Sequence, residues 1–285
     1  MSDAPGDVAA YYEQNTRMFL RFGRTGDIGA IHRELWAPGV GTVAEAVDHA
    51  HVLIGAQLPE IASPRILDLG CGVGGSLCQL LLQRRGEGVG LTISPTQAGL
   101  ARQRAEAAGL ADRCTFLCGD FTDPPKLEPF DLAFAIESFV HGPDPARFFQ
   151  AAAGLLRPGG RLVVIDDVLS PSPPPEAARH LDAFRRGWRV SSLEPPDALR
   201  QHAEQAGLTC VGDQDLTPWL RLWRWRDRAV AVAVVGLGWL PIPHPYWASL
   251  TGGHALQVCL SRGWLTYRMV LFERPRSSDP KAPDS

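Results

Sequence analysis

Residues 65–75 read RILDLGCGVGG, a short apolar run that ends in a cluster of glycines. The residues that follow, 76–85, place Leu77, Leu80 and Leu81 on one side of a helix. In the order strand, glycine turn and helix, the backbone of the turn can approach a ligand closely and the first helical N–H groups point at it. This stretch therefore predicts a ligand-binding turn at the start of an α/β domain.

Further apolar runs follow, separated by helical stretches. They predict strands at residues 88–92, 114–118, 130–136 and 161–166, and a last strand near residues 266–272. Strands that alternate with helices form a parallel sheet, and their continuous apolar character indicates that helices cover both faces. We therefore expect a doubly wound α/β fold.

The regions outside these strands predict the domain organisation. Residues 1–58 mix aromatic, basic and glycine residues ahead of the first strand and are expected to form a helical lid on a domain spanning residues 59–275. The sequence SPSPPP at residues 170–175 suits neither helix nor sheet, so we expect it to open a cap insertion that covers residues 170–206. The polar, proline-rich residues 276–285 are expected to be a disordered tail.

The composition argues for a globular enzyme that acts on a small molecule. Hydrophobic residues make up 45% of the chain, and the formal net charge is −3. Without a basic excess, binding of nucleic acid is not expected. The six cysteines show no C-x-x-C spacing, so we expect neither a metal site nor a disulfide framework. The sequence leaves the oligomeric state open, a homo-oligomer included.

The longest apolar run, residues 229–243, is shorter than the roughly 20 residues that span a bilayer, and it ends in prolines. We interpret it as a buried helix and expect no membrane span. No basic stretch followed by an apolar one is visible at the N-terminus, so no secretory signal is expected. These features favour a cytoplasmic protein.

Asp68 indicates the charge of the ligand. The glycines Gly70, Gly72 and Gly75 satisfy the G-x-G-x-x-G dinucleotide pattern, so their spacing alone does not exclude NAD. A carboxylate inside the turn, however, attracts an ammonium group and repels a pyrophosphate. An NAD-dependent oxidoreductase also predicts an acidic residue after the second strand, where this chain has Thr92. We therefore expect a ligand that is cationic at this end.

At residues 66–72, ILDLGCG, and 156–162, LRPGGRL, the chain resembles class I S-adenosylmethionine (SAM) dependent methyltransferases. The resemblance implies SAM as the cofactor and a mostly parallel, seven-stranded Rossmann-like sheet. It departs from many members at Thr92, where they have an acid for the ribose, and Gln97 is the candidate replacement. The predicted cofactor contacts are Asp68, Gly70, Gly72, Gly74, Thr92, Gln97, Asp120 and Phe121.

Other segments resemble one subgroup of this family. Residues 90–97, GLTISPTQ, are similar to a motif of sterol, cyclopropane-lipid and geranyl diphosphate carbon methyltransferases. The pair Glu137-Ser138 matches a glutamate and serine of the geranyl diphosphate enzymes, and residues 31–40, IHRELWAPGV, resemble bacterial prenyl-diphosphate methyltransferases. The resemblance implies methylation of an alkene carbon in a prenyl diphosphate or related isoprenoid, with Glu137 as the base.

That chemistry explains the residue types. When an alkene attacks the methyl group of a sulfonium, a carbocation forms, and a carboxylate stabilises it and then accepts a proton. Aromatic faces add cation–π stabilisation, basic groups contact phosphate, and a diphosphate also calls for Mg²⁺. The predicted substrate contacts are Tyr11, Tyr12, Arg24, His32, Arg33, Trp219 and Trp223.

Three alternatives stay open at this stage. His141 is the candidate base if the enzyme instead methylates oxygen or nitrogen in a small natural product. Trp219 and Trp223 are four residues apart, a spacing that also suits two residues of a helix packed in the core. A protein that binds SAM without turning over an acceptor would carry the same glycine turn.

Overall fold

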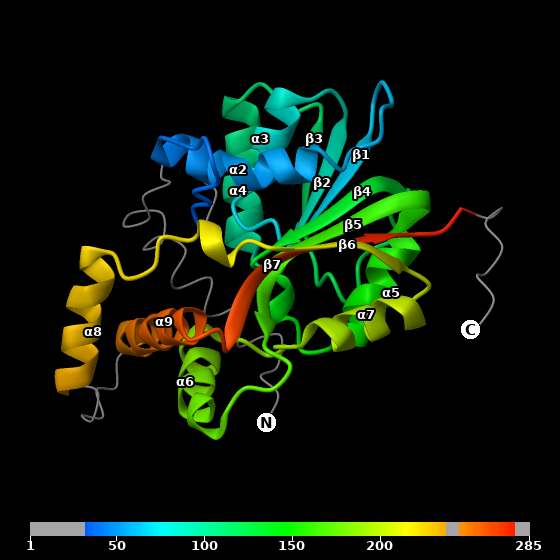
Figure 1. The fold of residues 1–285 in the computed structure, drawn as a ribbon. Helices are drawn as coiled ribbons and strands as arrows, with labels where there is room; N and C mark the ends of the chain where they lie inside the picture. The colour runs from blue at the N-terminus through cyan, green and yellow to red at the C-terminus, as the bar shows by residue number, and fades with distance from the viewer. Residues whose placement is uncertain (1–31, 238–244, 277–285) are drawn as a thin grey trace.

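The computed structural model describes residues 32–237 and 245–276 (Figure 1). Of the predicted substrate contacts, Tyr11, Tyr12 and Arg24 lie outside the described residues. The same holds for most of the predicted lid and for all but the first residue of the predicted tail. Every structural statement below refers to the described residues.

A seven-stranded sheet forms the centre of the fold, with the strand order β3-β2-β1-β4-β5-β7-β6. Strands β1 to β5 are parallel, and β7 runs antiparallel to both β5 and β6. This confirms the predicted doubly wound, mostly parallel sheet. The strands are β1 Arg65–Leu69, β2 Glu87–Thr92, β3 Cys114–Cys118, β4 Phe130–Ile136, β5 Leu156–Leu169, β6 Thr209–Asp215 and β7 Leu265–Glu273.

The β5 strand begins at Leu156 rather than at the predicted Arg161. Leu156 pairs with Phe130 of β4, and the register shifts between Phe130 and Leu132. The Pro-Gly-Gly segment at residues 158–160 lies at this irregularity, because Pro and Gly are tolerated where a ladder is interrupted.

Helices α2, α3 and α4 lie on one side of the sheet, and α5 and α7 lie on the other (Figure 1). Local signals start several of them: Thr42 makes a capping box with Glu45, and a proline follows each of the N-caps Ser94 and Asp144. The five helices are α2 Val43–Gly55, α3 Gly75–Gln83, α4 Pro95–Ala107, α5 Pro145–Leu155 and α7 Pro196–Gln205.

Part of the predicted lid belongs to the hydrophobic core. Leu35 and the α2 residues Ala50 and Ile54 have no exposed area and belong to the main hydrophobic cluster. Helix α2 packs on α3, so residues 43–55 form part of the helical layer over the sheet. The described half of the range that we had predicted as a lid is therefore built into the core.

Two insertions, rather than one, supply the cap. Helix α6, Ala178–Trp188, packs against α9, Pro245–Ser261, where Gly187 and Gly252 let the two backbones approach closely. Helix α9 comes from the segment between β6 and β7, which the sequence did not predict as cap. Helix α7 was predicted within the cap, but it packs on α5 and β6 as part of the sheet layers.

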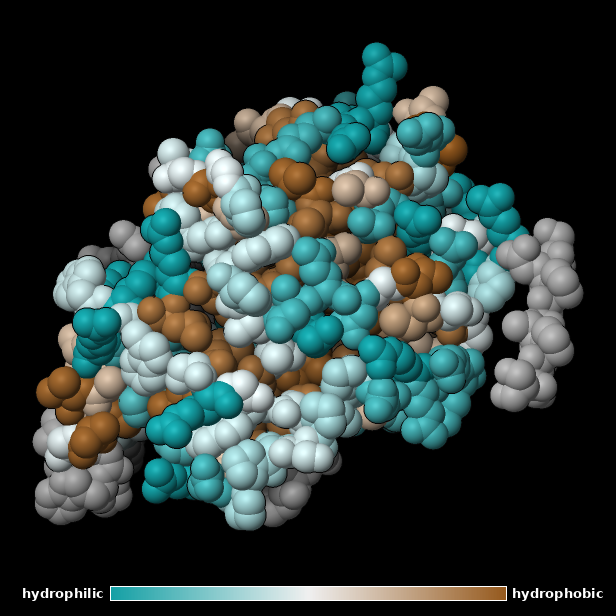
Figure 2. All heavy atoms as spheres, viewed as in Figure 1, coloured by the Kyte–Doolittle hydropathy of each residue, from teal (hydrophilic) through white to brown (hydrophobic). Residues whose placement is uncertain are grey.

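The apolar run that begins at Ala229 forms part of helix α8, Trp225–Leu237, which lies beside α9. We predicted a buried helix, and this was wrong: Val232 and Val235 are 76% and 75% exposed. The helix lies at the end of the molecule away from the sheet, where apolar side chains reach the surface (Figure 2). No described helix has the length and apolar character that crossing a membrane requires.

Candidate active site

A cavity of about 660 Å³ opens at the carboxyl ends of the parallel strands, beneath the cap helices. Ligands of open α/β sheets bind at this edge, because the strands deliver their following loops to it. The glycine turn after β1 and the loop after β4 contribute to its wall, together with residues of α6, α8 and α9. The cavity therefore joins the predicted cofactor turn to the predicted cap.

Asp68 fits a cationic partner. Its carboxyl group lies in the cavity wall and is 3% exposed, and Oδ2 has no hydrogen-bond partner among the described residues. Burial raises the pKa of Asp68 well above its ordinary value, with a smaller contribution from Cys78. A buried carboxyl oxygen without a partner costs free energy, which an ammonium group of the ligand would recover.

The glycines Gly70, Gly72 and Gly74 of the turn differ in the space around them. All three have positive φ angles, 87° at Gly70, 52° at Gly72 and 77° at Gly74. A side chain at Gly72 would meet nothing within 4 Å, so its backbone faces open space in the cavity. A side chain at Gly74 would instead meet Ala101 and Phe116 at 2.8 Å. Gly74, which we had predicted as a cofactor contact, allows close packing of the chain and is not in the cavity wall.

Thr92 and Gln97 form a buried pair at the second strand. The Thr92 hydroxyl donates to Oε1 of Gln97 at 2.8 Å, and both residues line the cavity. Asp120 and Phe121 line it as well, and Oδ1 of Asp120 accepts from the backbone and hydroxyl of Thr122 at 2.8 Å each. The structure thus brings these four predicted cofactor residues to the wall of one cavity.

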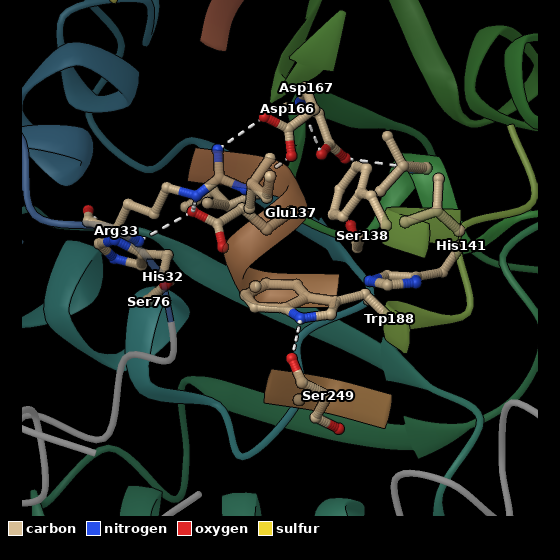
Figure 3. A pocket seen from close by; sticks show the side chains of 18 of the residues that line it. His32, Arg33, Ser76, Glu137, Ser138, His141, Asp166, Asp167, Trp188 and Ser249 are labelled. Atoms are coloured by element: carbon tan, nitrogen blue, oxygen red, sulfur yellow. Dashed lines mark hydrogen bonds and ion pairs between the residues drawn. The ribbon is translucent and has the colours of Figure 1, made fainter. Parts of the chain in front are cut away.

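Glu137 follows β4 directly and faces the middle of the cavity (Figure 3). Its φ of 48° is in the left-handed region, which is uncommon for a residue with a side chain and is found most often at functional sites. Oε1 accepts from the Arg33 backbone N–H and from the Tyr267 hydroxyl, each at 2.8 Å. Because both hydrogen bonds fall on one oxygen, Oε2 is the oxygen available to an acceptor molecule.

Arg33 was predicted to contact substrate, and it does line the cavity. Its guanidinium, however, binds Asp167 through two parallel hydrogen bonds of 2.7 and 2.6 Å (Figure 3). It also lies over the ring of Tyr267, with 4.6 Å from Cζ to the ring centroid. The bidentate pair holds the segment before α2 against β5 and β7 and fixes the groups around Glu137.

Replacing Arg33 with Met should destabilise the protein strongly. The Asp167 side chain is 1% exposed, so the variant would leave a buried carboxylate without its partner, at a cost of about 3 kcal/mol. Chemical denaturation with and without S-adenosylhomocysteine (SAH) measures this. The matched control is Arg147→Met, which removes a pair whose side chains are 70% and 45% exposed and should change stability by about 0.5 kcal/mol or less. Equal effects of both variants would contradict the structural role of Arg33.

The two predicted histidines both lie in the cavity wall. Nδ1 of His141 lies 3.1 Å from the carbonyl oxygen of Arg189, and burial lowers the pKa of this histidine. His141 is therefore a neutral imidazole at neutral pH. The ring nitrogens of His32 contact His51 and the backbone of Arg33, so His32 is already engaged within the protein.

The two predicted tryptophans are not in the cavity wall. Trp219 packs edge to face on His49, and Trp223 packs similarly on His254, at ring distances of 5.3 and 5.8 Å. The indole that lines the cavity is Trp188 of α6, whose Nε1 donates to the carbonyl of Ser249. Trp188 carries no local motif, and only the packing of α6 on α9 brings it to the site.

The cavity has more acidic than basic side chains. Its acids are Glu34, Asp68, Asp120, Glu137, Asp166, Asp167 and Asp227, and its arginines are Arg33, Arg221 and Arg224. Each arginine already has a partner: Arg224 binds Glu34 at 2.9 Å, and Arg221 stacks on Trp36 at 3.2 Å. Burial and the neighbouring Asp167 raise the pKa of Asp166 well above its ordinary value, as expected where acids crowd together.

Comparisons with known proteins agree with this geometry. Residues 67–164 match a family model described as a methyltransferase domain. The chain is 32% identical over 195 residues to the 27-O-demethylrifamycin SV methyltransferase of Amycolatopsis mediterranei (strain S699), covering 67% of this chain and 71% of that protein. The chain belongs to the SAM-dependent methyltransferases.

Other relatives of this methyltransferase differ in the methylated atom that their names state. The 24-methylenesterol C-methyltransferase 2 of Oryza sativa subsp. japonica is 31% identical over 164 residues, 54% of this chain and 45% of that protein. The geranyl diphosphate C-methyltransferase of Streptomyces coelicolor A3(2), solved with Mg²⁺, a thiolodiphosphate and SAH, has a TM-score of 0.74 at 18% identity, over 95% of this chain and 97% of that one. At that identity the likeness concerns the fold.

Binding of SAH to this methyltransferase should release protons. The pKa of Asp68 is raised in the free protein, whereas a carboxylate facing an ammonium group is ionised, so affinity should rise with pH through that pKa and then level off. Titration calorimetry in buffers with different ionisation enthalpies measures the proton count. An Asp68→Asn variant serves as the control and should release none. The same heat in every buffer for the unmodified enzyme would contradict the role of Asp68.

Proposed function

We propose that this methyltransferase transfers a methyl group to an alkene carbon of an isoprenoid, with Glu137 as the base. The observation that carries the proposal is the position of Glu137 in the cavity, oriented by Arg33 and Tyr267 through one oxygen only. A carboxylate fixed in this way is pre-organised to accept a proton through its other oxygen.

The chemistry assigns a separate task to each group. SAM, when bound, would supply an electrophilic methyl group, and the electron pair of the broken methyl–sulfur bond would stay on sulfur to give SAH. The alkene π electrons form the new carbon–carbon bond, and positive charge develops on the neighbouring tertiary carbon of the acceptor. Glu137 then removes a proton from the adjacent carbon, and the electrons of that C–H bond restore the double bond. The carboxylate of Glu137 gives the developing cation a favourable field.

The walls around Glu137 suit an apolar acceptor. Phe184 and Trp188 of α6 and Leu256 and Leu260 of α9 line the part of the cavity beneath the cap. An aromatic face contributes roughly 0.5 to 2 kcal/mol to a nearby cation, and the apolar walls exclude water that would quench it.

An uncharged isoprenoid fits the described cavity better than its diphosphate. The described arginines that line the cavity are paired with carboxylates or stacked on an indole, and acids outnumber them. A diphosphate would have to open one of these pairs or be bound by residues outside the described ranges. Among the described residues, no group of three or more His, Cys, Asp and Glu is placed to hold a metal ion.

A second candidate is O-methylation of a small natural product with His141 as the base. His141 lines the same cavity, and its lowered pKa keeps it in the neutral form that accepts a proton. The relative from Amycolatopsis is named for methylation at an oxygen.

A competition of acceptors with two variants tests both candidates. Purified enzyme with SAM is given geraniol, geranyl diphosphate with Mg²⁺, or a phenol, and the methylated atom is located by mass spectrometry and NMR. A carbon-methylated product that Glu137→Gln fails to make, and His141→Asn still makes, supports the isoprenoid proposal. An oxygen-methylated product with the opposite dependence on the two variants supports the second candidate and overturns the first.

A further inference from the structure

A row of polar groups runs from the cavity wall to the far side of α2. Nδ1 of His32 lies 3.1 Å from the carbonyl oxygen of Arg33, and its Nε2 lies 3.2 Å from Nε2 of His51. Nδ1 of His51 lies 3.1 Å from Oδ1 of Asp48, whose two oxygens also accept from the amide of Gln83 at 2.9 and 3.0 Å. The His51 side chain has no exposed area, whereas that of Asp48 is 28% exposed.

The two groups that end this row, the Arg33 carbonyl and the Asp48 carboxylate, determine how many protons the two histidines carry. A carbonyl oxygen and a carboxylate only accept hydrogen bonds, and the hydrogen bond from His51 lowers the pKa of Asp48, which keeps it ionised. Each of the three contacts therefore needs one N–H group. Two neutral imidazoles have two such groups, whereas one imidazole and one imidazolium have three. All three contacts are hydrogen bonds only when the histidine pair carries one positive charge.

The charge belongs on His51. Burial, and then the charge of His51, lower the pKa of His32 to about 4, although Glu137 and Asp48 act in the opposite direction. His51 in turn lies directly against the Asp48 carboxylate. His32 then keeps its one proton on Nδ1, donates it to the Arg33 carbonyl and accepts from His51 through Nε2.

We propose that the charged His51–His32 pair positions Glu137 by anchoring the backbone of Arg33, an inference that builds on the proposed role of Glu137 as the base. The Arg33 carbonyl is held by His32, and the Arg33 N–H donates to Glu137 at 2.8 Å. When the histidine pair loses its third proton, two lone pairs face each other in one of the three contacts. The pair then holds the backbone of Arg33 less firmly. Loss of the charge should therefore displace Glu137 and lower turnover.

The first test reads the charge directly and needs no acceptor. Long-range ¹⁵N–¹H spectra of the full chain, labelled at histidine, distinguish imidazole from imidazolium for each ring. We expect the His51 ring, assigned by its loss in His51→Gln, to be doubly protonated in the folded enzyme. Two neutral rings at neutral pH would overturn the proposal.

The second test separates positioning from general stability. His51→Gln cannot carry a positive charge, so kcat should fall by about a hundredfold, the typical penalty for a displaced catalytic group. SAH affinity should stay within error, and kcat is measured well below the lowered melting temperature that loss of a buried partner of Asp48 brings. The control is His49→Gln on the same helix, whose ring packs on Trp219 outside the row. A kcat in His51→Gln equal to that of the unmodified enzyme would overturn the proposal.

The two proposals fail in different ways. If Glu137→Gln keeps its activity, the base has been assigned wrongly, although the NMR spectra still report the charge of His51. If Glu137→Gln is inactive and His51→Gln behaves as the unmodified enzyme does, only the positioning role is lost.

Discussion

Replacing Glu137 with Gln should lower turnover by about 10² to 10⁴-fold, the range that a general base contributes, while SAH affinity stays unchanged. Gln keeps the size of the side chain and one carbonyl oxygen that can accept from Arg33 and Tyr267, so the local hydrogen bonds survive. What is lost is the carboxylate that takes the proton and stabilises the cation. Single-turnover rates of methyl transfer, measured beside calorimetric binding of SAH, separate these two effects.

Two further variants make this result specific. Glu106→Gln changes an exposed acid on α4 and should leave turnover unchanged. Tyr267→Phe keeps the base but removes one of its two donors, and should give an intermediate loss of about tenfold, the factor for a single hydrogen bond to a charged group. Full activity in Glu137→Gln would remove Glu137 from the mechanism and move the assignment to His141.

Replacing Gly70 with Ala should cost about 3 kcal/mol of stability and abolish tight SAH binding. The φ of 87° disfavours any side chain by about 1 to 2 kcal/mol, and the new methyl group would meet the Cβ and Oγ atoms of Ser138. Ser138 has little freedom to move, because it is buried and its hydroxyl donates to the carbonyl of Leu69 at 2.6 Å. Overpacking at such a site adds about 1 to 3 kcal/mol. Chemical denaturation and SAH calorimetry measure the two losses.

The matched control for this change is Gly109→Ala. Gly109 has a similar φ of 69°, but a side chain there would meet nothing within 4 Å, and the residue is not in the cavity wall. It should therefore show only the backbone cost of about 1 to 2 kcal/mol, with SAH affinity unchanged. If Gly70→Ala were no worse than this control, Ser138 would not be what requires glycine at position 70.

Local sequence patterns predicted the sheet well. Apolar runs gave strands close to their observed bounds, since a strand buried on both faces needs continuous apolar residues. Asp68 was singled out because a carboxylate inside the glycine turn suits a cationic ligand, whereas Glu137, Thr92 and Gln97 were singled out by the resemblance to a family of known enzymes. All four lie at the carboxyl edge of the sheet, because parallel strands deliver their carboxyl ends to one edge.

Patterns failed where a role depends on distant partners. Arg33 was predicted to contact substrate, but Asp167, which binds it, is 134 positions away in the sequence. The apolar residues of α8 looked like core, yet among the described residues the helix packs on α9 and leaves Val232 and Val235 exposed. Nothing in the sequence around His51 pointed to an imidazole at position 32.

The sequence alone thus determined the fold class, the glycine turn and the acid at the end of β4, because these follow from short-range periodicity and from the offset of a residue relative to its strand. Only the tertiary structure decided which charges are paired, which indole reaches the cavity and which groups orient Glu137. Such pairings depend on burial and on distances between segments far apart in the chain, and these are set when α2, β7 and the cap helices pack around the sheet.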